Sequence, residues 1–149
     1  MECREEGELS STMEDYLEAV WSIEEKTDIP RVKDISNLMN VTPPTVNSAM
    51  KCLKKRELIE QESYGYIKLT PEGRKIARYI RKRHNLLKRF FTEVLKLDSH
   101  KAEEDACRVE HNISTVTVQR IVDFLDFIAE SSEKGKPEWL ASFHSSYID

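Results

Sequence analysis

The tetrapeptide TPPT at positions 42–45 constrains the fold more than any other feature of this sequence. Proline lacks a backbone N–H and disfavours helix in the residue before it, so an undisturbed helix cannot run through this point. Proline is nevertheless well tolerated in the first turn of a helix, and threonine is a common N-cap. The tetrapeptide therefore predicts a helix over about 42–56 that Thr42 caps. Its expected buried face consists of Val46, Met50 and Leu53.

Two further helices are expected before this one. An apolar stripe predicts a helix over about 12–26, with its N-cap at Ser11 or Thr12. The stripe consists of Leu17, Val20, Trp21 and Ile23. Pro30 closes the connection that follows, and apolar residues at helical spacing predict another helix over about 31–39.

The segment LIEQESYGYIKLT, residues 58–70, has the pattern of a short β-hairpin. Apolar residues stand at both ends, and Gly65 near the middle suits a turn that needs a positive φ. A helix–turn–helix followed by a hairpin is the order of elements in a winged helix. We therefore expect a winged-helix domain over residues 1–71.

The second half of the chain, residues 72–149, reads as helical throughout. Periodic apolar residues predict one long helix from Pro71 to about Leu95 and two more over about 99–112 and 114–130. A linker over 131–137 and a short terminal helix follow, with Trp139, Leu140 and Phe143 on one side. The predicted fold class is thus mainly α. These C-terminal helices carry more apolar surface than they can bury among themselves, so a dimer interface is expected there.

The charges are unevenly distributed along the chain. The whole chain carries a net charge of −4, whereas residues 31–89 hold 15 Lys+Arg against 5 Asp+Glu, a balance of +10, which leaves −14 for the remainder. Such a division favours a basic surface for a polyanion and an acidic region with another role, although scattered solvated faces would give the same count. Charge alone does not separate these two interpretations.

Cysteine usage and hydropathy bear on the compartment. An odd number of cysteines, Cys3, Cys52 and Cys107, without an apolar signal segment is typical of a reduced, cytoplasmic protein. No run approaches the roughly 18 apolar residues that a membrane span needs. A cytoplasmic protein without membrane attachment is expected.

The start of the helix over 42–56 is a candidate DNA-reading surface. In helix–turn–helix proteins the second helix enters the major groove and its N-terminal residues meet the base edges. The residues at that end are Thr42, Pro44, Thr45, Asn47 and Ser48, and Lys51 follows. DNA phosphates would lie near the later basic residues Lys54, Lys55 and Arg56. Further candidates for contact with the DNA backbone are Tyr64 and Lys68 of the hairpin. The alternative is a solvated basic helix in a packing module.

A second set of residues has the spacing of a metal site. Glu103, Cys107, Glu110 and His111 share one face of the helix expected over 99–112. Thiolate, carboxylate and imidazole together suit a first-row transition metal. Asp15 and Glu18 repeat the i, i+3 spacing, and His84 lies in the long helix. The alternative is structural: a paired glutamate, a satisfied histidine and a small buried cysteine. His100 and His144 lack such partners and are expected at the surface.

The chain resembles the DtxR/MntR family of metal-dependent transcriptional repressors over about residues 11–130. The resemblance is carried by STMEDYLEAVWSIEE, VTPPTVNSAM, LTPEGRKIA, RHNLLKRF and ACRVEHNIS. It implies a homodimer with an N-terminal winged helix and a helical metal-binding and dimerisation domain. It also implies that a divalent metal acts as corepressor, so that the metal-bound protein binds operator DNA and uptake genes are repressed.

The resemblance also implies a ligand set, which combines two branches of the family. Asp15 and Glu18 match ligands of the manganese-type members, whereas Cys107 matches the iron-type branch. His84 and the pair Glu110 and His111 match ligands shared by both branches.

The ancillary site departs from the iron-type branch in three respects. Glu103 matches an ancillary-site position that holds histidine in the iron-type branch. Lys88 stands where that branch has a second-site glutamate. The resemblance is to a two-domain form, so the SH3-like third domain of the longer members, and any ligand from it, is not expected.

This hybrid set leans toward Fe²⁺ as the cofactor, with Mn²⁺ next, because thiolate and imidazole are softer than carboxylate. Other divalent transition metals are expected to bind in vitro as well. The alternative function is a winged-helix regulator that binds no metal. A helical metalloenzyme is a more distant alternative, since no nucleophile motif or glycine-rich phosphate loop is present, and no enzymatic activity is expected. Redox sensing through Cys107 is a lesser variant of the regulator.

Overall fold

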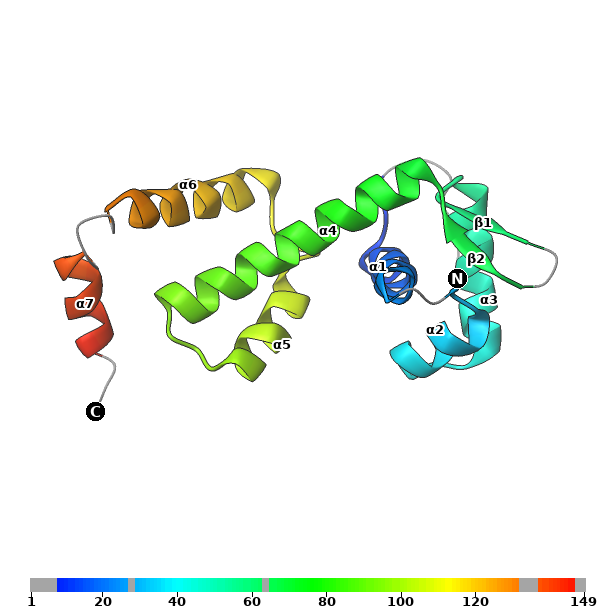
Figure 1. Ribbon diagram of the computed structural model, residues 1–149, viewed down its shortest axis with the longest axis horizontal. Helices are drawn as coiled ribbons and strands as arrows, with labels where there is room; N and C mark the ends of the chain where they lie inside the picture. The colour runs from blue at the N-terminus through cyan, green and yellow to red at the C-terminus, as the bar shows by residue number, and fades with distance from the viewer. Residues whose placement is uncertain (1–7, 27–28, 63–64, 132–136, 147–149) are drawn as a thin grey trace. The chain divides into compact units, whose positions relative to one another are not determined.

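A computed structural model describes residues 8–26, 29–62, 65–131 and 137–146 (Figure 1). The chain divides into two compact units, Met1–Arg81 and Lys82–Asp149. The division falls within helix α4, Pro71–Arg89, whereas the domain boundary predicted between residues 71 and 72 lies at the start of that helix. The described elements are mostly helical, which confirms the predicted fold class of a winged helix–turn–helix followed by a helical domain.

The first unit packs three helices, a hairpin and the first part of a fourth helix around one core. Its elements are α1 Ser11–Glu25, α2 Val32–Met39, α3 Pro43–Lys55, β1 Ile59–Gln61, β2 Ile67–Leu69 and the first part of α4. Leu17, Val46 and Leu53 are fully buried in this core, as the apolar spacing predicts. Burial of these side chains fixes which face of α3 is left for solvent.

Helix α1 begins one residue earlier than its predicted caps. Ser10 is the N-cap, with an extended backbone at φ −69° and ψ 153°, and its side chain accepts a hydrogen bond from Met13 N at 3.4 Å. The predicted caps Ser11 and Thr12 are wrong, because both already lie within the helix. Three hydroxyl residues in a row left the sequence ambiguous at this point, and backbone geometry decides among them.

The hairpin pairs β1 and β2 antiparallel, with Ile59 opposite Leu69. Gly65 has φ +78°, so its predicted role in the turn is confirmed. A third segment joins the hairpin, because Ile67 N donates to Pro30 O at 2.9 Å and Arg31 forms an isolated bridge with Tyr66. The connection between α1 and α2 is therefore fastened to the wing.

The described residues of the second unit form the end of α4 and four further helical segments. These are the π-helix η1 Phe90–Val94, α5 Ser99–Val109, α6 Thr115–Ser131 and α7 Glu138–Ser145. The predicted single helix from Pro71 to about Leu95 instead changes to the wider π-helix at Phe90. The Thr92 hydroxyl donates to the carbonyls of Lys88 and Arg89 at 2.9 and 3.2 Å, which competes with the regular helix ladder there.

The prediction that His144 lies at the surface is wrong. Its side chain is buried, and Nε2 donates to the carbonyl oxygen of Val94 at 2.9 Å. This carbonyl belongs to Val94, the last residue of η1. It can accept the hydrogen bond from His144 because the π-helix ends there, and the sequence pattern did not reveal that π-helix. His100 is exposed, as expected.

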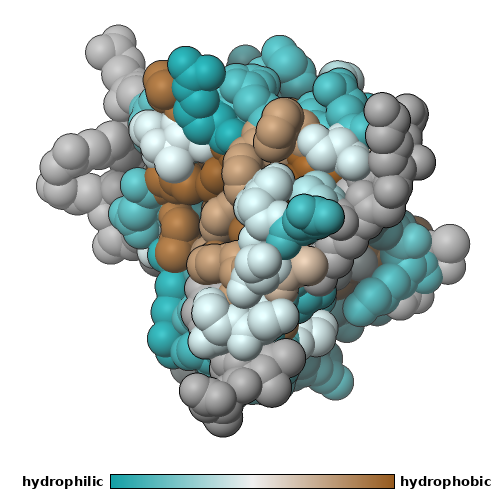
Figure 2. Space-filling model, turned by 90° about the vertical axis from the view of Figure 1, so that its left-hand side faces the viewer, coloured by the Kyte–Doolittle hydropathy of each residue, from teal (hydrophilic) through white to brown (hydrophobic). Residues whose placement is uncertain are grey.

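Several large apolar side chains of the second unit remain exposed. They are Val109, Val116, Phe127, Trp139 and Phe143. Figure 2 shows hydrophobic residues gathered on one face of the molecule and bordered by hydrophilic ones. Leu140 is buried, whereas Trp139 packs against Phe124 with ring centroids 6.1 Å apart. Within the described part of the chain, none of the helices is both long and apolar enough to cross a membrane.

Gly73 in the first turn of α4 gives a testable consequence of this packing. A Cβ at Gly73 would collide with the carbonyl oxygen of Leu58 and lie 2.9 Å from its carbonyl carbon. Gly73→Ala should therefore lower the free energy of unfolding by about 3 kcal/mol, as overpacking against backbone does. Gly65→Ala is the matched control: it meets open space and costs only about 1–2 kcal/mol for its positive φ. Chemical denaturation measures both, and equal losses would contradict the close approach.

Candidate functional site

The metal-site candidates of the second unit come from α4 and α5. Asp98 caps α5, because its carboxylate accepts hydrogen bonds from the backbone N–H groups of His100 and Lys101, each at 3.0 Å. From this start, one helical turn separates Glu103 from Cys107, and Glu110 is the C-cap. The cap thus fixes the residue at which α5 begins.

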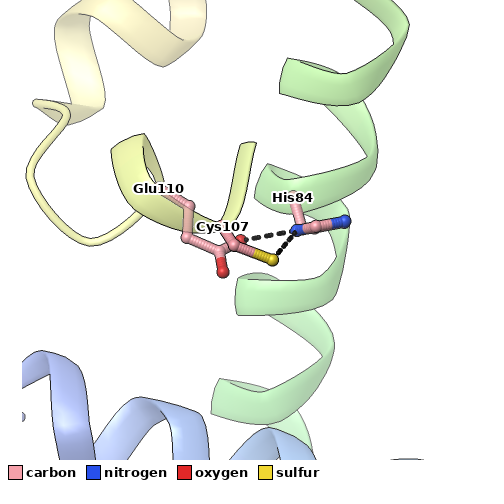
Figure 3. Close-up of side chains that lie close together, drawn as sticks. All are labelled: His84, Cys107 and Glu110. Atoms are coloured by element: carbon pink, nitrogen blue, oxygen red, sulfur yellow. Dashed lines mark hydrogen bonds and ion pairs between the residues drawn. The ribbon is translucent and has the colours of Figure 1, made fainter. Parts of the chain in front are cut away.

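Three side chains form the centre of the site (Figure 3). His84 Nδ1 lies 3.1 Å from Glu110 Oε2 and 3.9 Å from Cys107 Sγ. The three potential ligand atoms lie within 4.8 Å of one another. The side chains of His84 and Glu110 are only 3% and 2% exposed. Imidazole, thiol and carboxylate converge here, which is a donor set suited to a first-row transition metal.

The opposite edge of the imidazole faces Glu103. His84 Nε2 lies 3.1 Å from Glu103 Oε1, and Lys88 Nζ lies 2.7 Å from Glu103 Oε2. The hydrogen bond from the Lys88 ammonium is the main cause that holds the pKa of Glu103 below its ordinary value. Glu103 is therefore ionised at neutral pH.

The His84 ring lies between two carboxyl groups. An ionised carboxylate only accepts, so both contacts at once need a proton on each side of the ring. His84 Nδ1 would have to give up its proton to hold a metal ion, since ligation requires an unprotonated nitrogen. The donor set and this replaceable proton fit a divalent metal ion.

The remaining predicted ligands are distributed over both units. His111 Nε2 lies 3.4 Å from Glu110 Oε1, beside the central three residues. Asp15 is exposed on α1 in the first unit. Glu18, one turn later, accepts a hydrogen bond from Arg81 NH1 at 3.1 Å. The structure thus brings three of the predicted ligands together, with Glu103 at the other edge of the imidazole and His111 beside Glu110. The other two predicted ligands lie on α1.

The predicted DNA-reading residues lie at the start of α3. Thr42 occupies the N-cap position, but its hydroxyl contacts the Thr45 hydroxyl at 2.8 Å rather than a backbone N–H. Ser48 donates to the carbonyl of Pro44 at 3.1 Å. Thr45 is half-buried, whereas Thr42, Pro44, Asn47, Ser48 and Lys51 are exposed. This end of α3 therefore offers small polar side chains at its surface.

The basic residues continue along the same helix. Lys54 and Lys55 are exposed, in the last turn of α3. In the wing, Lys68 forms an ion pair with Glu62 at 2.6 Å, so its charge is partly neutralised. Tyr64, the other predicted wing contact, lies outside the described residues. Both described cysteines, Cys52 and Cys107, are thiols.

Sequence reasoning missed the contact between Arg31 and Tyr66. Arg31 NH2 donates to the Tyr66 hydroxyl at 3.0 Å, and the guanidinium carbon lies 4.8 Å from the ring centroid. Arg31 is an exposed cation at the N-cap of α2, next to the wing. Only its position in the basic segment hinted at a role, and nothing local in the sequence pairs it with Tyr66.

Two protein-family models match successive parts of the chain. Residues 8–67 match the iron dependent repressor N-terminal DNA binding domain. Residues 70–140 match the iron dependent repressor metal binding and dimerisation domain.

Individual relatives agree with these models. The HTH-type transcriptional regulator MntR of Bacillus pumilus is 34% identical over 123 residues, 83% of this chain and 85% of the relative. The diphtheria toxin repressor of Corynebacterium efficiens is 31% identical over 124 residues, 83% of this chain and 54% of the relative. The chain thus spans about half the length of that repressor.

Solved structures show the same fold. The structure of the manganese regulator SloR has a TM-score of 0.69 at 28% identity and covers 77% of this chain and 54% of its own. A manganese-dependent transcriptional repressor in complex with manganese has a TM-score of 0.72 at 27% identity. The match covers 77% of this chain and 53% of the repressor chain.

The Asp98 cap gives a pH-dependent prediction. Hydrogen bonds from backbone N–H groups, that of Lys101 first, hold the pKa of Asp98 below its ordinary value. Its stabilisation is therefore fully present above about pH 4 and is lost as pH falls through the lower, folded-state pKa. Asp98→Ala should lower the midpoint of thermal unfolding at pH 7, and the gap from the wild type should narrow as pH falls from 5 toward 3. Asp98→Asn, which keeps an acceptor oxygen, should remove most of the pH dependence and less of the stability; a gap independent of pH would contradict the cap.

Proposed function

Since the chain belongs to the DtxR/MntR family of metal-dependent transcriptional repressors, we propose that a divalent metal ion, Fe²⁺ in preference to Mn²⁺, controls its binding to operator DNA. The members of this family are repressors and not enzymes. The observation that carries the proposal is the convergence of the ligand atoms of His84, Cys107 and Glu110. His84 and Glu110 are buried, whereas Cys107 is exposed. The regulated genes are proposed to serve metal homeostasis.

The full ligand set is also a proposal. It comprises Asp15, Glu18, His84, Glu103, Cys107, Glu110 and His111. Support for the members in the second unit comes from their mutual contacts, and support for the two on α1 comes from the family resemblance and their i, i+3 spacing. When bound, the ion supplies positive charge among these carboxylates.

Charge repulsion gives the proposed link between metal and DNA. Glu18 forms an ion pair with Arg81, and Asp15 adds a further negative charge one helical turn before it on α1. Ligands on both units tie the DNA-binding unit to the dimerisation unit and fix the separation of the two recognition helices. Metal shifts this equilibrium only by its differential affinity for the DNA-competent arrangement. At the DNA, the N-terminal end of α3 reads base edges, and the later lysines lie near phosphates.

The preference for iron rests on Cys107. Thiolate and imidazole are softer donors than carboxylate and favour Fe²⁺ over Mn²⁺. The relatives include a diphtheria toxin repressor and several manganese regulators, so they support a divalent-metal repressor of either kind.

A homodimer is the proposed assembly. The exposed apolar side chains of the second unit, such as Phe127 and Trp139, supply surface for a second copy, and this half matches a dimerisation domain. We propose a cytoplasmic location, because operator DNA is the partner and thiols such as Cys107 persist in a reducing compartment. A metal-independent winged-helix regulator is the second candidate, and its DNA binding would be indifferent to chelators.

Glu110→Gln tests the metal dependence. The amide keeps the size of the side chain but removes the charge that a cation needs, so the metal-induced gain in DNA affinity, about 5- to 150-fold for typical allosteric coupling, should disappear. Glu104→Gln on the exposed side of α5 is the control and should behave as wild type. The probe is a set of short duplexes with promoter sequences from the organism that encodes this chain. Fluorescence anisotropy measures the affinity of the protein for them in chelator, in Mn²⁺ and, anaerobically, in Fe²⁺. Equal affinity of the wild type in all three would favour the metal-independent regulator.

Cys107→Ser tests the choice of metal. Serine offers a harder oxygen donor, so the Fe²⁺ concentration for half-maximal DNA binding should rise more than the Mn²⁺ concentration. Co²⁺ serves as a spectroscopic probe: the wild type should show a sulfur-to-cobalt absorption band that the variant lacks. Cys52→Ser, in the core of the first unit, is the control and should keep the band. An identical rise for both ions would overturn the iron preference while leaving metal control intact.

A further inference from the structure

The imidazole of His84 is also held at Nε2, the ring nitrogen that contacts neither Cys107 nor Glu110. Glu103 Oε1 lies 3.1 Å from His84 Nε2, and the other carboxylate oxygen lies 2.7 Å from Lys88 Nζ. Lys88 and His84 are one helical turn apart on α4, and Glu103 belongs to α5. A chain of three side chains thus runs from the ammonium through the carboxylate to the ring.

We propose that Lys88 is an internal counter-cation that positions His84 through Glu103, so that Nδ1 is the nitrogen presented to Cys107 and Glu110. This inference revises the proposed ligand set at one position, because it makes Glu103 a positioning residue rather than a metal ligand. The inference rests on the proposed function in one respect: it takes Nδ1 as the nitrogen that binds the ion.

Exposure explains why the lysine is needed. The side chain of Glu103 is 44% exposed, whereas that of His84 is 3% exposed. A half-exposed glutamate has many rotamers in solvent, and fixing one of them costs conformational entropy. The ammonium of Lys88 holds the carboxylate by a charge-assisted hydrogen bond, which offsets that cost. A ligating histidine commonly donates its other ring N–H to a carboxylate, and this contact fixes the ring's tautomer and orientation.

The charge of Lys88 also bears on the number of ions. A second cation at Glu103 would have to displace an ammonium that already occupies one carboxylate oxygen. A cation bound to Glu103 would lie close to the Lys88 ammonium, and the two positive charges would repel each other. Lys88 therefore opposes an ancillary ion at the Nε2 side of the ring. The lowered pKa of Glu103 agrees with a carboxylate that stays ionised beside a permanent cation.

Four variants test this role. Lys88→Gln removes the charge, Lys88→Arg keeps it, and Lys88→Glu reverses it. Lys82→Gln is the matched control, since Lys82 is exposed on the same helix. Circular dichroism checks that each variant folds.

The first readout is the ring proton on Nε2 of His84, observed by NMR in the chelated, ion-free protein. The wild type, Lys82→Gln and Lys88→Arg should show a slowly exchanging Nε2–H signal, because Glu103 accepts from it. Lys88→Gln should lose the signal to fast exchange with water. The same persistent signal in Lys88→Gln would overturn the positioning role.

The second readout is calorimetric titration with Mn²⁺. Lys88→Gln should weaken binding by about tenfold, the lower end for outer-sphere partners of metal ligands, whereas Lys88→Arg and Lys82→Gln should not. Lys88→Glu should bind one more Mn²⁺ than the wild type, because it places a second carboxylate beside Glu103 and His84 Nε2. Wild-type affinity in Lys88→Gln, together with unchanged stoichiometry in Lys88→Glu, would overturn the proposal.

The two readouts fail separately from the proposed function. A wild-type protein that binds neither Mn²⁺ nor Fe²⁺ contradicts the metal-dependent repressor, and the ring-proton pattern still decides whether Lys88 positions His84. Should Lys88→Gln not fold, Glu103→Ala interrupts the same chain at its next member. It should lose the ring-proton signal and weaken Mn²⁺ binding by about tenfold; wild-type behaviour in both would count against the inference.

Discussion

The contact between the buried Glu110 carboxylate and His84 is the constraint on which the second unit depends. Burying a carboxylate costs several kcal/mol unless charge and hydrogen bonds compensate it, so α5 can bring Glu110 inside only where α4 presents a donor. His84 meets that need at 3.1 Å, and His111 adds a contact at 3.4 Å. The requirement selects one register of α5 against α4, and that register also places Cys107 beside the imidazole.

Local patterns were sufficient to predict most of the secondary structure. The apolar stripe of α1, the prolines at the start of α3 and the glycine of the hairpin act within a few residues, so their signals can be read from sequence. The start of α1 was displaced by one residue, because Ser10, Ser11 and Thr12 are all competent caps and only backbone geometry distinguishes them. The convergence of His84, Cys107 and Glu110 followed from helical spacing together with the family resemblance, since spacing alone left a structural interpretation open.

Contacts between distant segments were beyond the reach of such patterns. The sequence shows that Lys88 replaces the glutamate of the iron-type branch. Its ion pair with Glu103, however, depends on how α4 and α5 pack. The same holds for Arg31 on Tyr66, where a cation and a ring from different elements meet at the wing. His144 was misjudged because its acceptor exists only at the end of a π-helix. In each case a side chain's role is decided by a partner that sequence periodicity does not identify.

The hydrogen bond from His144 to the Val94 carbonyl has a consequence for synthesis on the ribosome. The core of the first unit extends no further than Ile80, so that unit can fold once Ile80 has emerged from the ribosome, while later residues are still being translated. The second unit reaches its described packing only after α7 has emerged, because until then the buried Val94 carbonyl lacks the donor that the finished fold gives it. During that interval the nascent chain carries a folded winged helix beside a second unit whose packing is unfinished.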